Sequence, residues 1–142
     1  MSIDLETART IMAGTRAHAA EAGFKPMTVV VLDTGGHVVA AEREDGSSMK
    51  RFEIAFGKAH GALSLGMGSR SIMGRAEQQP FFIAAVTSAV GGALVPVPGG
   101  VLVRDADGAL LGAVGVTGDT SDNDEAAAVA GIESGGLRAQ PE

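Results

Sequence analysis

Residues 96–137 read PVPGGVLVRDADGALLGAVGVTGDTSDNDEAAAVAGIESGGL, and they carry the strongest local structural signal of the chain. Two apolar runs, 100–104 and 109–116, flank the pair Asp107-Gly108. An Asp-Gly pair between two such runs is typical of a tight β-hairpin turn. The sequence therefore predicts that the two runs are neighbouring antiparallel strands.

The acidic stretch 119–125 follows this hairpin and precedes an alanine-rich run that predicts a last helix over 124–132. Acidic side chains favour the first turn of a helix, and free backbone N–H groups make such a junction suitable for a binding site. Two capping-box-like pairs are possible, Ser121 with Asp124 and Asp122 with Glu125. Capping is the favoured interpretation, and a weak divalent-cation site or a general base remains open.

The rest of the chain predicts an α+β fold within a single domain, residues 1–142. Helices are expected at 3–22, 50–65 and 78–90, with a polar, partly helical segment at 69–79. Strands are expected at 27–32, 37–43 and 95–97. The strand at 27–32 is apolar on both faces and is therefore predicted to be central, whereas two prolines favour an edge position for 95–97. Hairpin connections imply a central antiparallel sheet of about five strands flanked by helices.

Composition narrows the classes of function. The chain has no Cys, which excludes disulfides, a thiolate nucleophile and Cys-bound metal centres. A net charge of −6 argues against nucleic acid as a partner. No apolar run reaches the length of about 20 residues that a membrane-spanning helix needs. The acidic N-terminus does not look like a signal peptide, so a cytoplasmic location is expected.

Three stretches carry a resemblance to a known family: MTVVVLDTGGHVVAAEREDG (27–46), IAFGKAHGAL (54–63) and PVPGGVLVRDADGALLGAVGVTGDTSDNDEAAAVAG (96–131). They resemble the "D-x-G-G-H" turn with its "R-x-D-G" ending, the "A-x-x-K-A" helix and the C-terminal hairpin of GlcG/HbpS-like proteins. That family also includes the C-terminal domain of PduO proteins. The resemblance implies a profilin-like α/β/α sandwich, a homo-oligomer, and haem or a related tetrapyrrole as ligand.

His60 is the leading candidate for a functional residue. Glu53, Gly57 and His60 share one face of the predicted helix by their i, i+4, i+7 spacing. A carboxylate beside an imidazole fixes its tautomer and raises its basicity, which suits either a metal ligand or a general base. Gly57 and Gly61 interrupt the helical pattern at a cost in stability, so they are expected to permit the close approach of another element or of a flat ligand.

Three further residues are weaker candidates for contacts with a cofactor. Lys58 occupies the lysine position of the family's helix motif and is a candidate anchor for a carboxylate or propionate. It lies two residues from His60 and so points about 160° away from it around the helix. Arg43 matches the family's "R-x-D-G" arginine and is a second candidate anchor. His18 is a candidate because histidines around the first helix are associated with haem contact in the family.

Two functions therefore remain open. In the first, the protein binds haem or a related tetrapyrrole, although it has no Trp or Tyr and only five Phe. In the second, it is a small catabolic enzyme, of tautomerase, deaminase or hydrolase type, that acts on a carboxylate-bearing intermediate. His60 or an acid, with Glu53 as the candidate, would then move the proton, and Arg43 or Lys58 would hold the carboxylate. A homo-oligomer is expected in both cases, held partly by a ridge of small residues that includes Gly57, Gly61 and Gly68.

Overall fold

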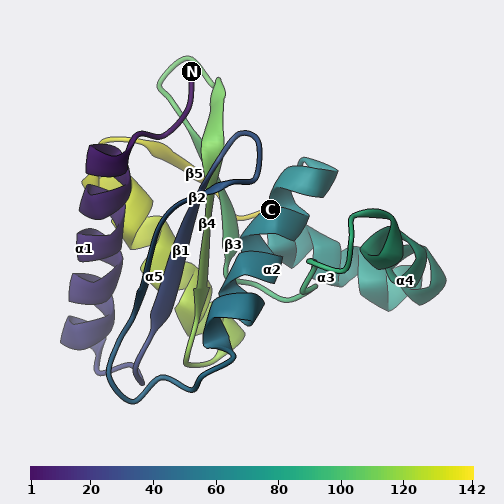
Figure 1. Ribbon diagram of the computed structural model, residues 1–142, viewed down its shortest axis with the longest axis horizontal. Helices are drawn as coiled ribbons and strands as arrows, with labels where there is room; N and C mark the ends of the chain where they lie inside the picture. The colour runs from purple at the N-terminus through teal and green to yellow at the C-terminus, as the bar shows by residue number, and fades with distance from the viewer.

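The computed structural model describes all 142 residues and contains one antiparallel sheet between layers of helices (Figure 1). The elements are, in chain order, α1 (Leu5–Ala22), β1 (Thr28–Asp33), β2 (Val38–Arg43), α2 (Arg51–Leu65), α3 (Ser69–Gln78), α4 (Pro80–Ala89), β3 (Gly100–Arg104), β4 (Leu110–Thr117), α5 (Ser121–Ser134) and β5 (Arg138–Gln140). The predicted α+β sandwich is confirmed. No helix is both long enough and apolar enough to cross a bilayer.

The five strands are hydrogen-bonded in the order β2-β1-β4-β3-β5, and every neighbouring pair is antiparallel. The predicted central position of β1 is confirmed, since β1 lies between β2 and β4 and is buried along almost its whole length. The predicted strand at 95–97 is wrong. The fifth strand is β5 at the C-terminus, and it pairs with β3.

Helices α1 and α5 cover one face of the sheet (Figure 1). Asp4 begins α1 by accepting a hydrogen bond from the Thr7 amide at 2.8 Å, and Gly23 ends it with a φ of 74°. Both boundaries follow the expected chemistry of helix caps. Glycine also lets α1 and α5 pack closely, because a side chain at Gly131 would overlap Thr15. The resulting core is aliphatic, as the lack of aromatic residues predicts.

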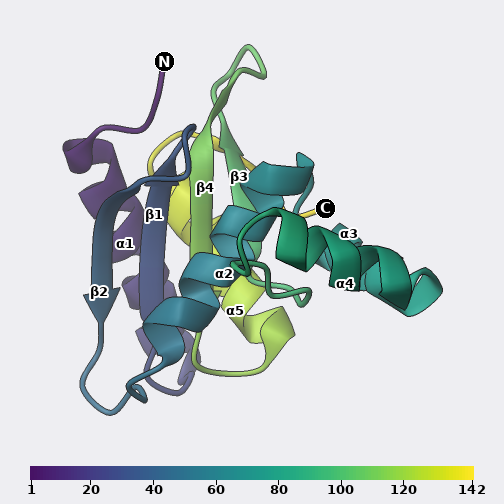
Figure 2. The ribbon, with the colours of Figure 1, turned by 45° about the vertical axis from the view of Figure 1, so that its right-hand side comes forward.

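Helix α2 covers the opposite face through small side chains (Figure 2). Ala55, Ala59 and Ala62 are fully buried against the sheet. A side chain at Gly115 would overlap the carbonyl of Ala55, and one at Gly100 would overlap that of Lys58. Glycines in β3 and β4 therefore bring the backbone of α2 directly onto the sheet.

Helices α3 and α4 extend away from the sandwich as an arm (Figure 2). They share a small apolar cluster of their own, which includes Ile72, Ile83 and Leu94. On the outer side of α4, Phe81 is 73% exposed. After α4 the chain returns over α2 as an irregular segment, 93–95, and the Val95 amide donates to the Gly57 carbonyl at 3.1 Å.

Candidate functional site

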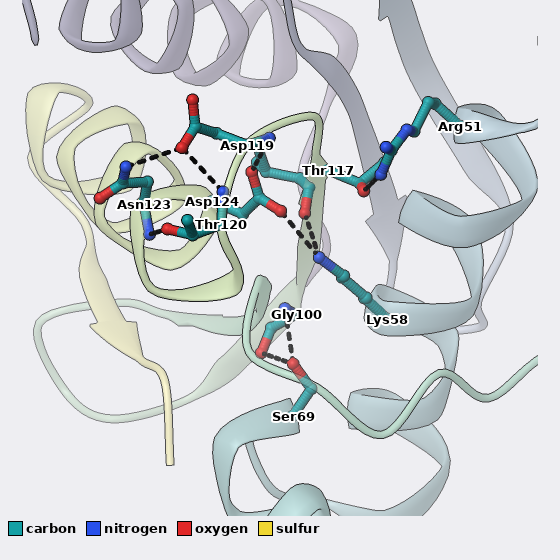
Figure 3. Close-up of polar contacts among 10 residues, drawn as sticks. Arg51, Lys58, Ser69, Gly100, Thr117, Asp119, Thr120, Asn123 and Asp124 are labelled. Atoms are coloured by element: carbon teal, nitrogen blue, oxygen red, sulfur yellow. Dashed lines mark hydrogen bonds and ion pairs between the residues drawn. The ribbon is translucent and has the colours of Figure 1, made fainter. Parts of the chain in front are cut away.

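Lys58 points into the protein, toward the start of α5. Its Nζ donates to Asp124 Oδ2 at 3.1 Å and to the Val116 carbonyl at 2.9 Å (Figure 3). Both charged side chains are only 2% exposed. Lys58 is therefore the partner of a buried carboxylate, and this conformation does not offer it to the carboxylate of a ligand.

Burial dominates the titration of this ion pair. Loss of hydration lowers the pKa of Lys58, and the attraction of Asp124 opposes that change. Loss of hydration likewise raises the pKa of Asp124, against the attraction of Lys58. Both shifts reflect the cost of keeping charge away from water.

The acidic stretch organises the start of α5 by a different arrangement from the expected capping boxes. Thr120 is the N-cap, and its hydroxyl accepts from the Asn123 amide at 3.2 Å. Asp124 accepts the Asp119 amide at 2.9 Å besides binding Lys58 (Figure 3). The expected pairs Ser121–Asp124 and Asp122–Glu125 are therefore wrong.

Two other acids of this stretch bind the α3 arm. Arg70 on α3 forms ion pairs with Asp122 and with Glu125, the latter at 3.0 Å. These hydrogen bonds to carboxylates raise the pKa of Arg70. The start of α5 is thus tied to both α2 and α3, which accounts for its acidic composition as a structural feature.

His60 lies at the side of α2 and faces the β1–β2 turn. Its Nδ1 lies 2.9 Å from the carbonyl oxygen of Ala93. A carbonyl can only accept, so a neutral His60 carries its proton on Nδ1 and leaves a lone pair on Nε2. Gly36, with a φ of 80°, lies beside that edge of the ring, and a Cβ there would approach Cδ2 to 3.3 Å.

A shallow depression of about 180 Å³ opens at this edge of the imidazole. It is lined by Thr34, Gly35, Gly36, His60, Leu63 and Ser64. Fixing one ring nitrogen by a backbone carbonyl is a common way to orient a histidine that acts through the other nitrogen. His60 can therefore act through Nε2 as a metal ligand or as a proton acceptor.

Glu53 does not orient His60. Its carboxylate lies 3.6 Å from Lys50 Nζ on the exposed first turn of α2. The role that the sequence analysis gave to Glu53 is taken by the Ala93 carbonyl, which arrives on the segment after α4. Helical spacing placed Glu53 on the correct face, but it lies almost two turns from the ring.

Aromatic rings form a row along α2 beside His60. Phe52 and Phe56 stack with their centroids 6.0 Å apart, and Phe56 stacks on His60 at 5.3 Å. All three rings are partly exposed. They give this side of the helix a row of apolar ring edges next to an imidazole.

Strand β2 extends this surface, because α2 lies mainly over β1, β4 and β3 (Figure 2). Val30 faces α2, and its partner on β2 is Ala41; antiparallel partners share a face of the sheet. By the same register Arg43 lies on this face, opposite Thr28. Its guanidinium donates to the Ser47 carbonyl at 2.7 Å and has no acidic partner.

Gly57 and Gly61 do allow a close approach, and the approaching element belongs to the same chain. A Cβ at Gly57 would lie 2.7 Å from Val95, and one at Gly61 would lie 3.0 Å from Leu94. A side chain at Gly68 would overlap the backbone of Pro141. Other segments of the same chain therefore cover the glycines of the small-residue ridge, and no room remains there for a ligand or a second subunit.

His18 lies apart from His60, on α1 and therefore on the other face of the sheet. Its ring is half-buried and meets Phe24 edge-on at 5.9 Å. A depression of about 300 Å³ is lined by His18, Glu21 and Ala22. Thus His60 and Arg43 share a face, whereas Lys58 and His18 belong to other parts of the molecule.

The buried ion pair between Lys58 and Asp124 was not predicted from the sequence, although the sequence does indicate that Lys58 is buried. Ala55, Lys58, Ala59 and Ala62 follow the spacing of a single helical face, and that face is buried. A lysine on such a face needs a buried acceptor. Nothing local in the sequence identifies that acceptor as Asp124, 66 residues away.

Comparison with solved structures shows the same fold in several proteins. The haem complex of PduOC superposes with a TM-score of 0.82 at 20% identity, over 94% of this chain and 95% of that one. The Klebsiella pneumoniae protein ORFY superposes with a TM-score of 0.83 at 25% identity, over 94% of this chain and 90% of that one. A double mutant of Streptomyces reticuli HbpS superposes with a TM-score of 0.78 at 26% identity, over 94% of this chain and 86% of that one.

Comparison with curated proteins found none that matches. The model of one protein family matches residues 3–133, and that family is described as haem degrading protein, HbpS-like. The match includes the hairpin, α2 and the acidic start of α5. The chain therefore belongs to the HbpS-like family of haem degrading proteins.

Proposed function

We propose that this protein binds haem or a related tetrapyrrole on the open face beside α2, with His60 as the axial ligand. The observation that carries the proposal is the hydrogen bond from Nδ1 to Ala93, which holds the ring and leaves Nε2 free. Haem, when bound, supplies an iron whose axial position a neutral imidazole nitrogen can occupy.

The neighbouring side chains suit the rest of a macrocycle. Phe52 and Phe56 offer apolar contact through their ring edges, in a row with His60. Arg43 lies on the same face of the sheet and has no carboxylate partner. Its guanidinium binds Ser47 near the start of α2, so it could hold only a propionate that extends away from His60 toward that end of the helix. Family membership and the haem in the PduOC structure support the same ligand class.

The size of the depression limits how such a ligand is held. Pockets that enclose a drug-sized molecule measure about 300–1,000 Å³, whereas the depression at His60 measures about 180 Å³. The macrocycle would therefore lie across the surface, with its outer side covered by a second copy of the chain. Phe81 on α4 gives such copies an exposed apolar contact, and a homo-oligomer is part of the proposal.

The same small depression favours one other function. A neutral imidazole with a free Nε2 is a suitable general base, and 180 Å³ accommodates a small acid better than a macrocycle. In this alternative the protein is a catabolic enzyme for a carboxylate-bearing intermediate.

Titration of the purified protein with haem separates the two functions. Binding predicts a shifted Soret band that saturates at one haem per chain, or per pair of chains if two copies share it. A Soret change that grows without saturation would contradict the proposal and leave the acid/base enzyme as the remaining function.

A further inference from the structure

A second polar depression, of about 180 Å³, lies at the opposite end of α2. It is lined by Lys25, Pro26, Gly46, Ser47, Ser48, Arg51 and Gly118. Arg51 precedes His60 by nine residues, which corresponds to about 13 Å along a helix. The two depressions are therefore separate sites. We propose that the one at Arg51 binds a small oxyanion, the carboxylate or phosphate group of a small molecule.

The charged side chains that line this depression, Lys25 and Arg51, are both positive. Arg51 donates to the Thr117 hydroxyl at 2.9 Å (Figure 3). Neither Arg51 nor Lys25 forms an ion pair with a carboxylate. No acidic side chain lines the depression. The Asp119 carboxylate accepts the Lys25 amide at 2.8 Å and is close enough to be influenced by the Lys25 charge. Arg51 is therefore the lining cation whose side chain contacts only a neutral group, Thr117. In a protein with a net charge of −6, such a cation favours an anion from outside the chain.

A buried hydroxyl pair gives independent support. Thr28 and Ser47 are 1% and 6% exposed, and their hydroxyl oxygens lie 2.8 Å apart. One O–H donates to the other oxygen, which leaves the second O–H free to donate to a further acceptor. An oxyanion in the depression that Ser47 lines would supply such an acceptor.

Backbone geometry at the rim is also suited to an anion. Helix α2 begins here, and no side chain caps it. The amide of Ser48 donates to no backbone acceptor. Gly46, with a φ of 90°, shapes the loop without placing a side chain over the opening. Free N–H groups at a helix start attract negative charge.

The experiment is an NMR titration of ¹⁵N-labelled protein at neutral pH and constant ionic strength. Inorganic phosphate and acetate are added separately, and sodium chloride serves as the reference. The amides of Gly46, Ser48 and Gly118 are expected to shift saturably with one oxyanion, with a dissociation constant on the order of 1 mM. The oxyanion that binds more tightly shows whether the depression prefers a phosphate or a carboxylate group.

Variants test whether the two cations hold the anion. Arg51→Gln and Lys25→Gln are each expected to weaken binding about tenfold. Lys25 is exposed, so its substitution leaves the fold intact even if Arg51→Gln unfolds the protein. Arg9→Gln removes an equal charge from the exposed side of α1 and is expected to bind like the wild type. Shifts that do not saturate, or equal weakening by Arg9→Gln, would overturn the proposal.

Discussion

Lys58 Nζ lies 3.1 Å from Asp124 Oδ2, and this buried ion pair joins the middle of α2 to the first turn of α5. It crosses the end of β4, where Lys58 also holds the Val116 carbonyl. A charge at this position is costly without its partner. The pair therefore fixes how α2 and α5 sit on opposite faces of the sheet.

Removing one member of this pair should be strongly destabilising. Lys58→Met leaves Asp124 buried and unpaired, and we expect the free energy of unfolding to fall by about 3–5 kcal/mol. Urea unfolding measures the loss. The double variant Lys58→Met/Asp124→Asn removes both charges and should be more stable than Lys58→Met alone. Equal stability of the two variants would show that buried charge is not the cause.

The exposed pair between Lys50 and Glu53 provides the control for this measurement. Its atoms lie 3.6 Å apart, and both side chains are largely in water. Lys50→Met should change the free energy of unfolding by less than about 1 kcal/mol.

Asp119 should contribute a pH-dependent part of the stability. Its carboxylate accepts the amides of Lys25 and Thr120 and the side-chain amide of Asn123, at 2.8, 2.7 and 2.8 Å. Hydrogen bonding, first of all from the Lys25 amide, lowers the pKa of Asp119 from 3.8 to about 2. The folded state therefore prefers the ionised form, so this stabilisation is full above pH 3.8 and is lost as the pH falls through about 2.

Comparison of the wild type with Asp119→Asn tests this pH dependence. The difference in the free energy of unfolding should be largest above pH 3.8 and should shrink toward pH 2. Asp107 lies on the exposed hairpin turn and its carboxylate accepts no hydrogen bond, so Asp107→Asn is the matched control. A difference for Asp119→Asn that stays constant across this range would contradict the assignment.

Phe81 should promote association of the chain. It is 73% exposed on α4, whose main contact with another helix is with α3. Phe81→Ser is expected to lower the mass measured by light scattering at micromolar concentration, because it removes apolar surface from the contact. Met49→Ser, at a position 78% exposed outside the arm, should leave the mass unchanged. A wild-type monomer at that concentration would contradict the proposed homo-oligomer.

The small-residue ridge should act on stability and not on association. Leu94 already lies 3.0 Å from the position of a Cβ at Gly61. We expect Gly61→Leu to lower the melting temperature because it displaces the segment after α4. The same displacement moves Ala93, so the variant should also loosen His60. An unchanged melting temperature would show that the segment accommodates the larger side chain.

Local signals made much of the fold predictable. Asp107-Gly108 forms the expected hairpin turn, and Gly108 has a φ of 87°, which only glycine adopts easily. Asp4 and Gly23 cap α1 through contacts with neighbouring backbone groups, which is again a local signal. The apolar run 27–32 predicted a central strand because both of its faces had to be buried.

Partners that are distant in the sequence were not predictable. The run Val95–Val97 looks like a strand but packs on Gly57 as an irregular segment, while the short β5 forms only because β3 offers a free edge. Helical spacing predicted that Lys58 and His60 point apart. It could not show that Lys58 meets Asp124 or that Ala93 holds His60, because both contacts depend on tertiary packing.

The most direct test of the haem proposal is a haem titration of His60→Ala beside His18→Ala, followed by the Soret band. His60→Ala removes the ring that Ala93 orients, whereas His18→Ala removes one on the other face of the sheet. We expect His60→Ala to shift the Soret maximum and to weaken haem binding at least about tenfold, with His18→Ala unchanged. An unchanged spectrum and affinity in His60→Ala, or their loss in His18→Ala alone, would contradict the account.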